Sequence, residues 1–597
     1  MTAEDPAFDP DALRRRYLEE RERRLRPEGI EQYVWVEGDR AGFADDIYVQ
    51  EPIERPPLTD EVDVALIGAG FGGLLLGAHL RKLGVESIRL IDKAGDVGGT
   101  WYFNRYPGVA CDIESYVYLP LLEDLGYVPT EKYANGAEIF AHARRIAEAY
   151  DLYRDACRQT TVTDLRWDEA ARRWIIETDR GDAMRARFVC LANGFFQKPK
   201  LPGIAGIDTF AGRVFHTSRW DYDYTGGDAS GNLTGLARKR VGIIGTGASA
   251  VQCIPHLAES AAHLYVFQRT PSSVDVRANR PTDPAWAEAL RPGWQRERVD
   301  NFQTLTAGGF VEEDLVDDGW TDILTKLLTI ITADDDPDLS PEAIDRAVET
   351  ADFVKMEEIR ARVDALVTDP KIAEALKPWY RQFCKRPCFH DGYLQTYNRP
   401  DVTLVDTQGH GVDQITETAV VVGGVEYELD CLILATGFEM GTDYSKRAGF
   451  PIVGVDGLSL SEAWSDGVRT FHGLYLEGFP NLTMVSIAQS GFTTNFVYLL
   501  EVQARHGAWT IATALDRDIE RLEASPTAVA DWVDAVMERS GRTAEFSANC
   551  TPGFYNNEGQ VERKTLQAGF YFGGPTEYAD ILEAWRADGR LDGLEYT

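Results

Sequence analysis

Two segments of the sequence show the same succession of a buried strand, a turn of small residues and an apolar helix. The first spans residues 62–83, and the second begins at Arg240. Glycines in such turns let the backbone approach a pyrophosphate, and the helix N-terminus supplies amide donors. The sequence therefore predicts an α/β protein with two Rossmann-like dinucleotide-binding domains. The small residues of the two turns are Gly68, Gly70, Gly73, Gly245, Gly247 and Ala250.

The residue after the next strand indicates which dinucleotide each module binds. The strand at 87–91 ends at Asp92, about 20 residues past the glycines, where an acid binds an unmodified ribose. The strand at 264–267 is followed by Gln268, Arg269 and Thr270 instead. An arginine and a threonine at that place suit a 2′-phosphate, which favours NADPH. The alternative is that Arg269 is an ordinary surface residue.

Gly98–Asp112 is rich in glycine and aromatic residues and suits neither a regular helix nor a strand. We expect an ordered loop whose rings pack against a flat partner. Because it follows the ribose acid of the first module, it favours contact with a flavin ring and thus FAD at that site. A surface loop held together by aromatic packing is the alternative.

Thr209–Asp221 lies between the two modules and belongs to neither turn. It carries His216 and Trp220, which are unusual side chains for a plain connector. We expect this hinge to join the two halves, with the alternative that it is only a tether.

The domain organisation follows from these modules. Residues 1–60 form an N-terminal extension with a solvated helix, interpreted as a docking arm. Residues 61–200 are the first part of the FAD-binding domain, and residues 201–424 are the NADP-binding domain with a helical insertion at about 278–380. Residues 425–597 return to complete the FAD-binding domain and end in a C-terminal loop.

Charge and cysteine usage exclude several classes of function. The net charge of −35 argues against nucleic acid or an anionic membrane as a partner. The eight cysteines form no C-x-x-C pair, which predicts reduced thiols in a cytoplasmic protein without a signal peptide or membrane span. No zinc-protease, serine-hydrolase or P-loop motif occurs, and Asp334–Asp336 lacks the spacing of a calcium loop, so no metal is expected. Without a redox cysteine pair, oxygen is the natural acceptor of electrons from a reduced flavin.

Two longer patterns carry a family resemblance. The hinge pattern F-x-G-x-x-x-H-T-x-x-W-D resembles the signature of type I Baeyer–Villiger monooxygenases, and the loop pattern G-G-x-W, Y-P-G and D is similar to that family's second signature. The resemblance runs from about Val62 to the C-terminus. The hinge signature residues are Phe210, Gly212, His216, Thr217, Trp220 and Asp221.

The resemblance implies an FAD- and NADPH-dependent enzyme that uses O2 to convert a ketone into an ester or lactone through a C4a-peroxyflavin. Arg386 matches the family's catalytic arginine and Asp112 the acid that positions it, while Lys385, Arg269 and Thr270 match NADP phosphate contacts. The extension resembles that of members acting on large cyclic, steroid or polycyclic ketones, and a monomer or homodimer is expected. The implied cofactor-binding residues are Gly68, Gly70, Phe71, Gly73, Asp92, Lys93, Gly99, Thr100, Trp101, Tyr106, Asp112, Gly245, Thr246, Gly247, Ala248, Ser249, Arg269, Thr270, Lys385 and Gln489.

Two other functions stay open at this point. An N- or S-oxygenating flavin monooxygenase would use the same two modules, and a non-catalytic flavoprotein could respond to NADPH by closing them. The role of the C-terminal loop around Cys550 is also open, since some relatives carry a tryptophan near that place.

Overall fold

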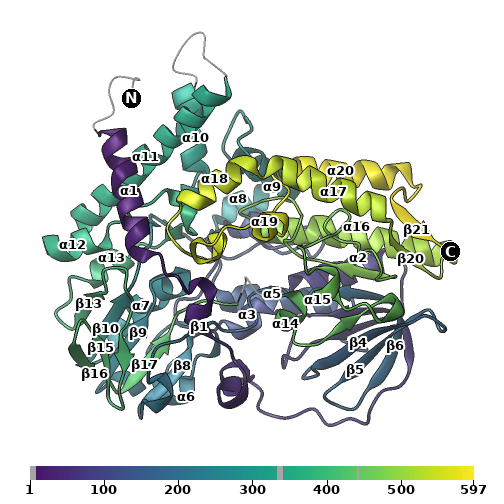
Figure 1. Ribbon diagram of the computed structural model, residues 1–597, viewed down its shortest axis with the longest axis horizontal. Coiled ribbons are helices and arrows are strands. Elements are labelled where there is room, and N and C mark those ends of the chain that lie inside the picture. The colour runs from purple at the N-terminus through teal and green to yellow at the C-terminus, as the bar shows by residue number, and fades with distance from the viewer. Residues whose placement is uncertain (1–7, 332–339, 440–442) are drawn as a thin grey trace.

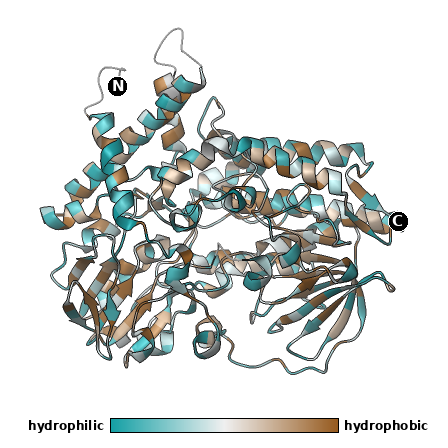
Figure 2. Ribbon diagram, in the orientation of Figure 1, coloured by the Kyte–Doolittle hydropathy of each residue, from teal (hydrophilic) through white to brown (hydrophobic). Residues whose placement is uncertain are grey.

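Two β-sheets, each in its own lobe, form the framework of the chain (Figure 1). The computed structural model describes residues 8–331, 340–439 and 443–597, so the acidic run Asp334–Asp336 lies outside the described residues. Apolar residues concentrate in the strands of both sheets, as Figure 2 shows by colour. This arrangement confirms the predicted α/β class with two Rossmann-like modules.

The first sheet has the strand order β18-β4-β5-β6-β2-β3, with β19 pairing β6. Strand β2 lies in the interior of this sheet, and its residues Val64 and Leu66 are fully buried. Helix α2 (Phe71–Lys82) follows the first turn and packs against α16 (Phe496–Asp516), so late residues cover an early module. The strands are β2 Glu61–Ile67, β3 Ile88–Ile91, β4 Val162–Asp168, β5 Arg173–Thr178, β6 Ala183–Leu191, β18 Ile452–Val453 and β19 Leu482–Met484.

The second sheet is parallel throughout, in the order β13-β10-β9-β17-β8. Helix α7 (Ala248–Ser260) follows its glycine turn. The strands are β8 Arg213–His216, β9 Arg240–Ile244, β10 His263–Gln268, β13 Val402–Asp406 and β17 Cys431–Leu434.

One expectation about this sheet is wrong. The chain does not return to the first domain at residue 425, because the fully buried strand β17 lies between β9 and β8. The crossing comes only after Leu434. A buried strand such as β17 requires partners on both sides, and β9 and β8 supply them. Part of the expected hinge thus forms the strand β8, which is the edge strand of this sheet.

The insertion is helical, as expected. Its residues Val363 and Leu376 pack in the core of the second lobe, whereas Phe302 and Trp320 pack in the core of the first. Helix α11 begins at the predicted Ser340-Pro341 start, where the Ser340 hydroxyl accepts a hydrogen bond from the amide of Ala343 at 3.3 Å. The helices are α8 Pro284–Ala289, α9 Trp294–Thr306, α10 Gly319–Ile331, α11 Pro341–Leu366 and α12 Pro370–Leu376.

The N-terminal extension is docked on the second lobe. Helix α1 (Pro10–Arg24) was expected to be solvated, but Leu13 and Tyr17 are buried against Phe353 of α11. The Tyr17 and Phe353 rings meet edge-on at 5.8 Å between centroids. Beyond α1, the strand β1 (Tyr33–Val34) pairs with β7 (Leu201–Pro202), so the arm runs along the hinge side of the lobe.

In the C-terminal segment, α18 and α19 lie between the lobes, whereas α17 and α20 lie over the first lobe, as Figure 1 shows in yellow tones. Cys550, which directly follows α18, forms a disulfide with Cys384 at a Cα–Cα distance of 5.1 Å. The expectation of eight reduced thiols is therefore wrong for two of them, because residues 166 apart in sequence meet in space. No described helix is long and apolar enough to cross a membrane. The elements are α17 Pro526–Arg539, α18 Gly541–Asn549, η8 Phe554–Gly559, α19 Arg563–Gln567 and α20 Pro575–Asp588, flanked by β20 Leu522–Ala524 and β21 Leu594–Tyr596.

Trp220 should be the most costly hinge residue to truncate. Its ring is fully buried, packs edge-on against Phe215 at 5.3 Å, and donates from Nε1 to Thr225 Oγ1 at 3.1 Å. We expect Trp220→Ala to lower the free energy of unfolding by about 3–5 kcal/mol, measured by urea unfolding followed by circular dichroism. The control Trp35→Ala, at a side chain 41% exposed, should cost about 0.5 kcal/mol or less. Equal losses in both variants would contradict a structural role for the hinge tryptophan.

Candidate active site

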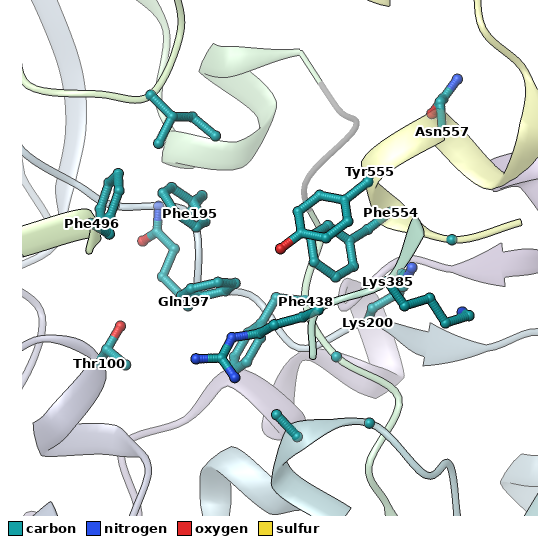
Figure 3. A pocket seen from close by; sticks show the side chains of 18 of the residues that line it. Thr100, Phe195, Gln197, Lys200, Lys385, Phe438, Phe496, Phe554, Tyr555 and Asn557 are labelled. Atoms are coloured by element: carbon teal, nitrogen blue, oxygen red, sulfur yellow. The ribbon is translucent and has the colours of Figure 1, made fainter. Parts of the chain in front are cut away.

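One cavity of about 1990 Å³ lies between the lobes and is lined by both glycine turns, the aromatic loop and the C-terminal segment. Its walls thus come from both modules and from residues near each end of the described chain. Figure 3 shows part of the cavity from close by.

The first glycine turn leaves space where a pyrophosphate would lie. A Cβ atom at Gly68, whose φ is +113°, would meet the carbonyl of Ala192 at 2.3 Å, and one at Gly73 would meet the Gly68 carbonyl at 1.9 Å. At Gly70 the nearest atom would be 3.7 Å away. Gly68 and Gly73 therefore allow close packing, whereas Gly70 leaves the N-terminus of α2 open towards the cavity. This arrangement fits a dinucleotide.

Asp92 lies at the rim of this turn, as predicted. Its carboxylate accepts hydrogen bonds from the amides of Ala69 at 2.6 Å and Ala94 at 2.8 Å, and it lines the cavity. Burial raises the pKa of Asp92, and burial lowers the pKa of the adjacent Lys93 to about 8. The remaining lone pairs of the carboxylate can accept ribose hydroxyls.

The loop 98–112 connects the two modules across the cavity. Gly99, at φ +54°, approaches Gly70 so closely that a Cβ would lie 2.8 Å from the Gly70 Cα. Trp101, in the short helix α3 (Thr100–Phe103), donates to the hydroxyl of Tyr118 at 3.0 Å. Tyr106 donates to Gln252 of α7 at 2.9 Å. The loop is ordered by packing and by contacts to the second module, and its lining residues can face a flat ring system.

The second turn repeats the geometry of the first. Gly245 has φ +110°, and its Cβ would lie 2.5 Å from the Ala435 carbonyl. A Cβ at Gly247 would meet nothing within 4 Å, so the N-terminus of α7 is also open. Thr246, Ala248 and Ser249 line the cavity here. A second pyrophosphate fits this turn on the same grounds.

Beside this turn the structure gathers positive charge. Arg269 is 25% exposed along its side chain, and Lys385 donates to the carbonyl of Pro552 at 3.2 Å. Burial, and then the nearby Arg269, lower the pKa of Lys385 to about 8. The buried hydroxyl of Thr270 has no hydrogen-bond partner among the described residues. Two cations and an unused hydroxyl are a donor set that fits a phosphate.

Arg386 and Asp112 meet where the two modules face each other. The guanidinium donates from both terminal nitrogens to both carboxylate oxygens, with Nη2 to Oδ1 at 2.5 Å. Burial disfavours the charge of Arg386, but the Asp112 carboxylate outweighs this and raises the pKa of Arg386 well above its ordinary value. Trp320 of α10 donates to the Asp112 carbonyl at 2.8 Å, and its ring lies 5.7 Å from the guanidinium. Arg386 is therefore a fixed cation that remains 36% exposed.

Aromatic side chains line the cavity next to this cation. Figure 3 shows the rings of Phe438, Phe554 and Tyr555 on one side and those of Phe195 and Phe496 on the other. The Phe554 and Tyr555 rings contact each other at 4.1 Å between centroids. Such walls suit a large apolar molecule and exclude water from its surroundings.

The hinge residues lie behind the site and do not line the cavity. His216 is fully buried, and burial lowers its pKa to about 3, so its imidazole is neutral. Its ring packs edge-on against Phe438 at 5.6 Å, and Asp221 caps the helix α6 (Tyr222–Thr225). Phe210, Gly212 and Thr217 are likewise part of the packing around β8. The hinge therefore packs behind a cavity wall, and its histidine does not reach the cavity.

The structure contradicts the prediction for Gln489. This residue was expected to bind a cofactor, but its side chain is fully buried and the residue does not line the cavity. The amide group donates to the carbonyls of Val468 at 2.8 Å and Gln567 at 3.0 Å and accepts from Thr470. All its polar atoms stabilise the loop, and the neighbouring Ala488 lines the cavity instead.

Several residues of the site were not found from the sequence. Lys200 and Glu558 lie beside Arg269, and Tyr33 of the extension joins them. Trp320 supports Asp112. Isolated lysines, acids and aromatics of this kind form no motif, so no local signal could have identified them.

Known proteins resemble this chain along nearly its whole length. A family model described as pyridine nucleotide-disulphide oxidoreductase matches residues 65–306. Neopentalenolactone D synthase of Streptomyces avermitilis is 56% identical, covering 98% of this chain and 99% of the relative. The Baeyer–Villiger monooxygenase ATR8 of Stachybotrys chlorohalonatus is 49% identical, covering 99% and 95%.

A solved structure agrees with these sequence relatives. Polycyclic ketone monooxygenase from the thermophilic fungus Thermothelomyces thermophila superimposes with a TM-score of 0.91 at 39% identity, covering 98% of this chain and 99% of that one. These three proteins match this chain over nearly its full length. The same chain carries the two signatures, the two dinucleotide turns and the paired Arg386 and Asp112. The chain belongs to the Baeyer–Villiger monooxygenases, a family of FAD- and NADP-dependent flavoenzymes.

Proposed function

We propose that this enzyme binds FAD at the first glycine turn and NADPH at the second, and that it oxygenates a ketone held beside Arg386. The proposal rests mainly on the pair of the buried Asp112 and the partly exposed Arg386, which lies in one cavity with both turns. We propose that residues 61–200 and those after Leu434 form the FAD-binding domain and that residues 201–434 form the NADP-binding domain, and the strand order of the two sheets supports this assignment.

When bound at the first glycine turn, FAD would supply the redox chemistry that activates O2, with NADPH at the second turn as the source of electrons. The contribution of the protein is positional and electrostatic. The Arg386 guanidinium, held by Asp112, stabilises negative charge that develops beside it, in surroundings where the aromatic walls exclude water. Because Asp112 keeps Arg386 charged, this residue acts as a cation and not as a proton donor. The product is an ester, or a lactone when the ketone is cyclic.

The substrate class follows from the cavity and from the relatives. The cavity has a volume of about 1990 Å³, and several aromatic side chains line it, including Phe438, Phe554 and Tyr555. The structural neighbour is a polycyclic ketone monooxygenase, and the relative with 56% identity is a neopentalenolactone D synthase. We infer a large cyclic or polycyclic ketone.

The hinge supports catalysis indirectly. His216 in β8 touches Phe438, which lines the cavity, so a shift of the second lobe on NADPH binding would move that wall. This role couples cofactor binding to closure over the flavin without proton transfer by His216.

Arg386→Ala should abolish ester formation while leaving flavin binding and NADPH oxidation in place, because the variant loses the cation beside the reacting ketone and keeps both glycine turns. The variant also leaves the buried Asp112 carboxylate without its partner, which lowers the stability of the protein. Product analysis by mass spectrometry, with cyclic ketones, amines and sulfides offered in parallel, measures this directly. In Arg386→Lys the charge remains without the two-point contact to Asp112, and we expect partial activity. A normal lactone yield from Arg386→Ala would show that this residue is not needed for the reaction. If the wild-type enzyme formed only N-oxides or S-oxides, the proposed reaction with ketones would be contradicted.

Arg269→Ala should raise the Michaelis constant for NADPH far more than that for NADH, because only NADPH carries the 2′-phosphate. A lost charged hydrogen bond of about 2–3 kcal/mol corresponds to roughly a thirtyfold to 150-fold change. Initial rates with both cofactors give the comparison. Equal effects on NADPH and NADH would refute the phosphate contact.

A further inference from the structure

The cations of the second turn are held by a buried carboxylate that comes from the other end of the chain. Glu558, in η8 of the C-terminal segment, is 3% exposed. Its Oε2 pairs with Arg269 Nη2 at 3.1 Å, and its Oε1 pairs with Lys200 Nζ at 3.3 Å. Tyr33 of the extension donates to the same Oε1 at 3.0 Å. Both oxygens of the carboxylate are therefore satisfied in a buried setting.

The backbone at Asn557 and Glu558 adopts a left-handed conformation, which is uncommon for residues other than glycine. Asn557 and Glu558 are consecutive non-glycine residues with φ values of +51° and +56°. Each left-handed residue costs roughly 1–2 kcal/mol, and such conformations persist only where surrounding contacts impose them. The contacts here are those of Asn556, whose side chain bonds the loop backbone at Gly553 and Gly559, and those of Glu558 itself. The chain thus turns so that this carboxylate points at the cations.

The cations that act on Glu558 outnumber this single carboxylate. Arg269, Lys200 and Lys385 all act on Glu558 and hold its pKa down against the effect of burial. Three cations and one carboxylate leave two positive charges, which matches a phosphate monoester of about −1.5 to −2. The carboxylate therefore does not need to leave for a phosphate to bind.

Arg269 keeps donors for such a phosphate. Glu558 engages Nη2, and Gln32 of the extension accepts from Nη1 at 2.7 Å. A guanidinium has five N–H donors, and that of Arg269 is partly exposed towards the cavity beside the unpaired Thr270 hydroxyl. The arrangement parallels the Arg386–Asp112 pair, in which a buried acid fixes an arginine that faces the cavity.

The loop that carries Glu558 also carries a wall of the ketone site. Phe554 and Tyr555 precede Glu558 by a few residues, and Figure 3 shows their rings projecting into the cavity that Lys200 and Lys385 line. The Cys384–Cys550 disulfide joins the start of this segment to the residue before Lys385. The phosphate end of the cofactor site and the ketone wall are therefore parts of one cross-linked unit.

We propose that Glu558 is a positioning residue for the ribose 2′-phosphate of NADPH, because it holds Arg269 and Lys200 in place. Since Phe554 and Tyr555 belong to the same loop, the position of this cavity wall is linked to the phosphate end of the site. The inference rests on the proposed function, since it assumes that the second turn binds NADPH. Glu558 contributes to the preference for NADPH over NADH without touching the phosphate.

The test compares Glu558→Gln, Arg269→Ala and the double variant, each loaded with FAD. Binding of NADP+ and NAD+ is measured by calorimetry, and initial rates with NADPH and NADH are measured in parallel. We expect Glu558→Gln to weaken NADP+ binding roughly tenfold to a hundredfold, the range usual for outer partners of a binding group. NAD+ binding should change less than about threefold, and in the Arg269→Ala background Glu558→Gln should have little further effect. The Michaelis constant for NADPH should rise while kcat at saturating NADPH changes much less.

Two further variants separate this role from a loss of folding. Glu538→Gln removes the same charge from an exposed site on α17 and should leave NADP+ binding unchanged. Tyr33→Phe removes one donor to Glu558 without changing charge, and should weaken NADP+ binding a few-fold with NAD+ unaffected. If Glu558→Gln fails to fold, Tyr33→Phe provides the test: weaker NADP+ binding would support the proposal, and unchanged NADP+ binding would contradict it.

The failures of the two proposals are distinguishable. Wild-type protein that binds NADP+ and NAD+ equally would overturn the NADPH site, and the role of Glu558 with it. A wild type that prefers NADP+, together with a Glu558→Gln variant that binds NADP+ equally or more tightly, would overturn only this inference, because the carboxylate would then compete with the phosphate.

Discussion

The ion pair between Arg386 and Asp112 joins the two lobes inside the cavity, where we propose that the ketone binds. Asp112 ends the aromatic loop of the first module, and Arg386 lies 274 residues later, where the chain returns from the helical insertion. A buried charge pair of this kind requires both partners, since removing one leaves an uncompensated charge. The relative position of the lobes therefore determines whether Asp112 can hold the Arg386 guanidinium in the cavity. Trp320 of the insertion supports the pair from a third segment.

Arg386 and Arg269, which both line the cavity, are held in the same way, although they lie in different parts of it. Asp112 fixes Arg386 beside the aromatic walls, and Glu558 fixes Arg269 beside the second glycine turn. In each case a nearly fully buried carboxylate orients a guanidinium that stays partly exposed. Arginine suits this use because its planar fork can bond an acid on one edge and a ligand on the other. Charge can then be placed inside a protein whose overall charge is −35.

The parts of the fold that depend on adjacent residues could be predicted from the sequence. Each strand, glycine turn and helix N-terminus is one contiguous segment, so Gly68, Asp92, Gly245 and Arg269 were identified at their places in the two modules. The parts that depend on distant residues could not. Strand β17 joins the second sheet after the expected boundary because β8 and β9 need a neighbour, and Gln489 is used by its own loop. Lys200, Glu558 and the Cys384–Cys550 pair have no local pattern at all.

The contact between Tyr33 and Glu558 has a consequence for how the protein is made. These residues are 525 positions apart, so one is synthesised long before the other. At about 5–20 residues per second, the ribosome needs roughly half a minute to two minutes to bridge this interval. During that time the two lobes can form their sheets, but the wall around Arg269 lacks its carboxylate, and the two arms of the chain cannot yet meet. The dinucleotide site is thus one of the last features of the molecule to mature, and it is completed after most of the framework is already in place.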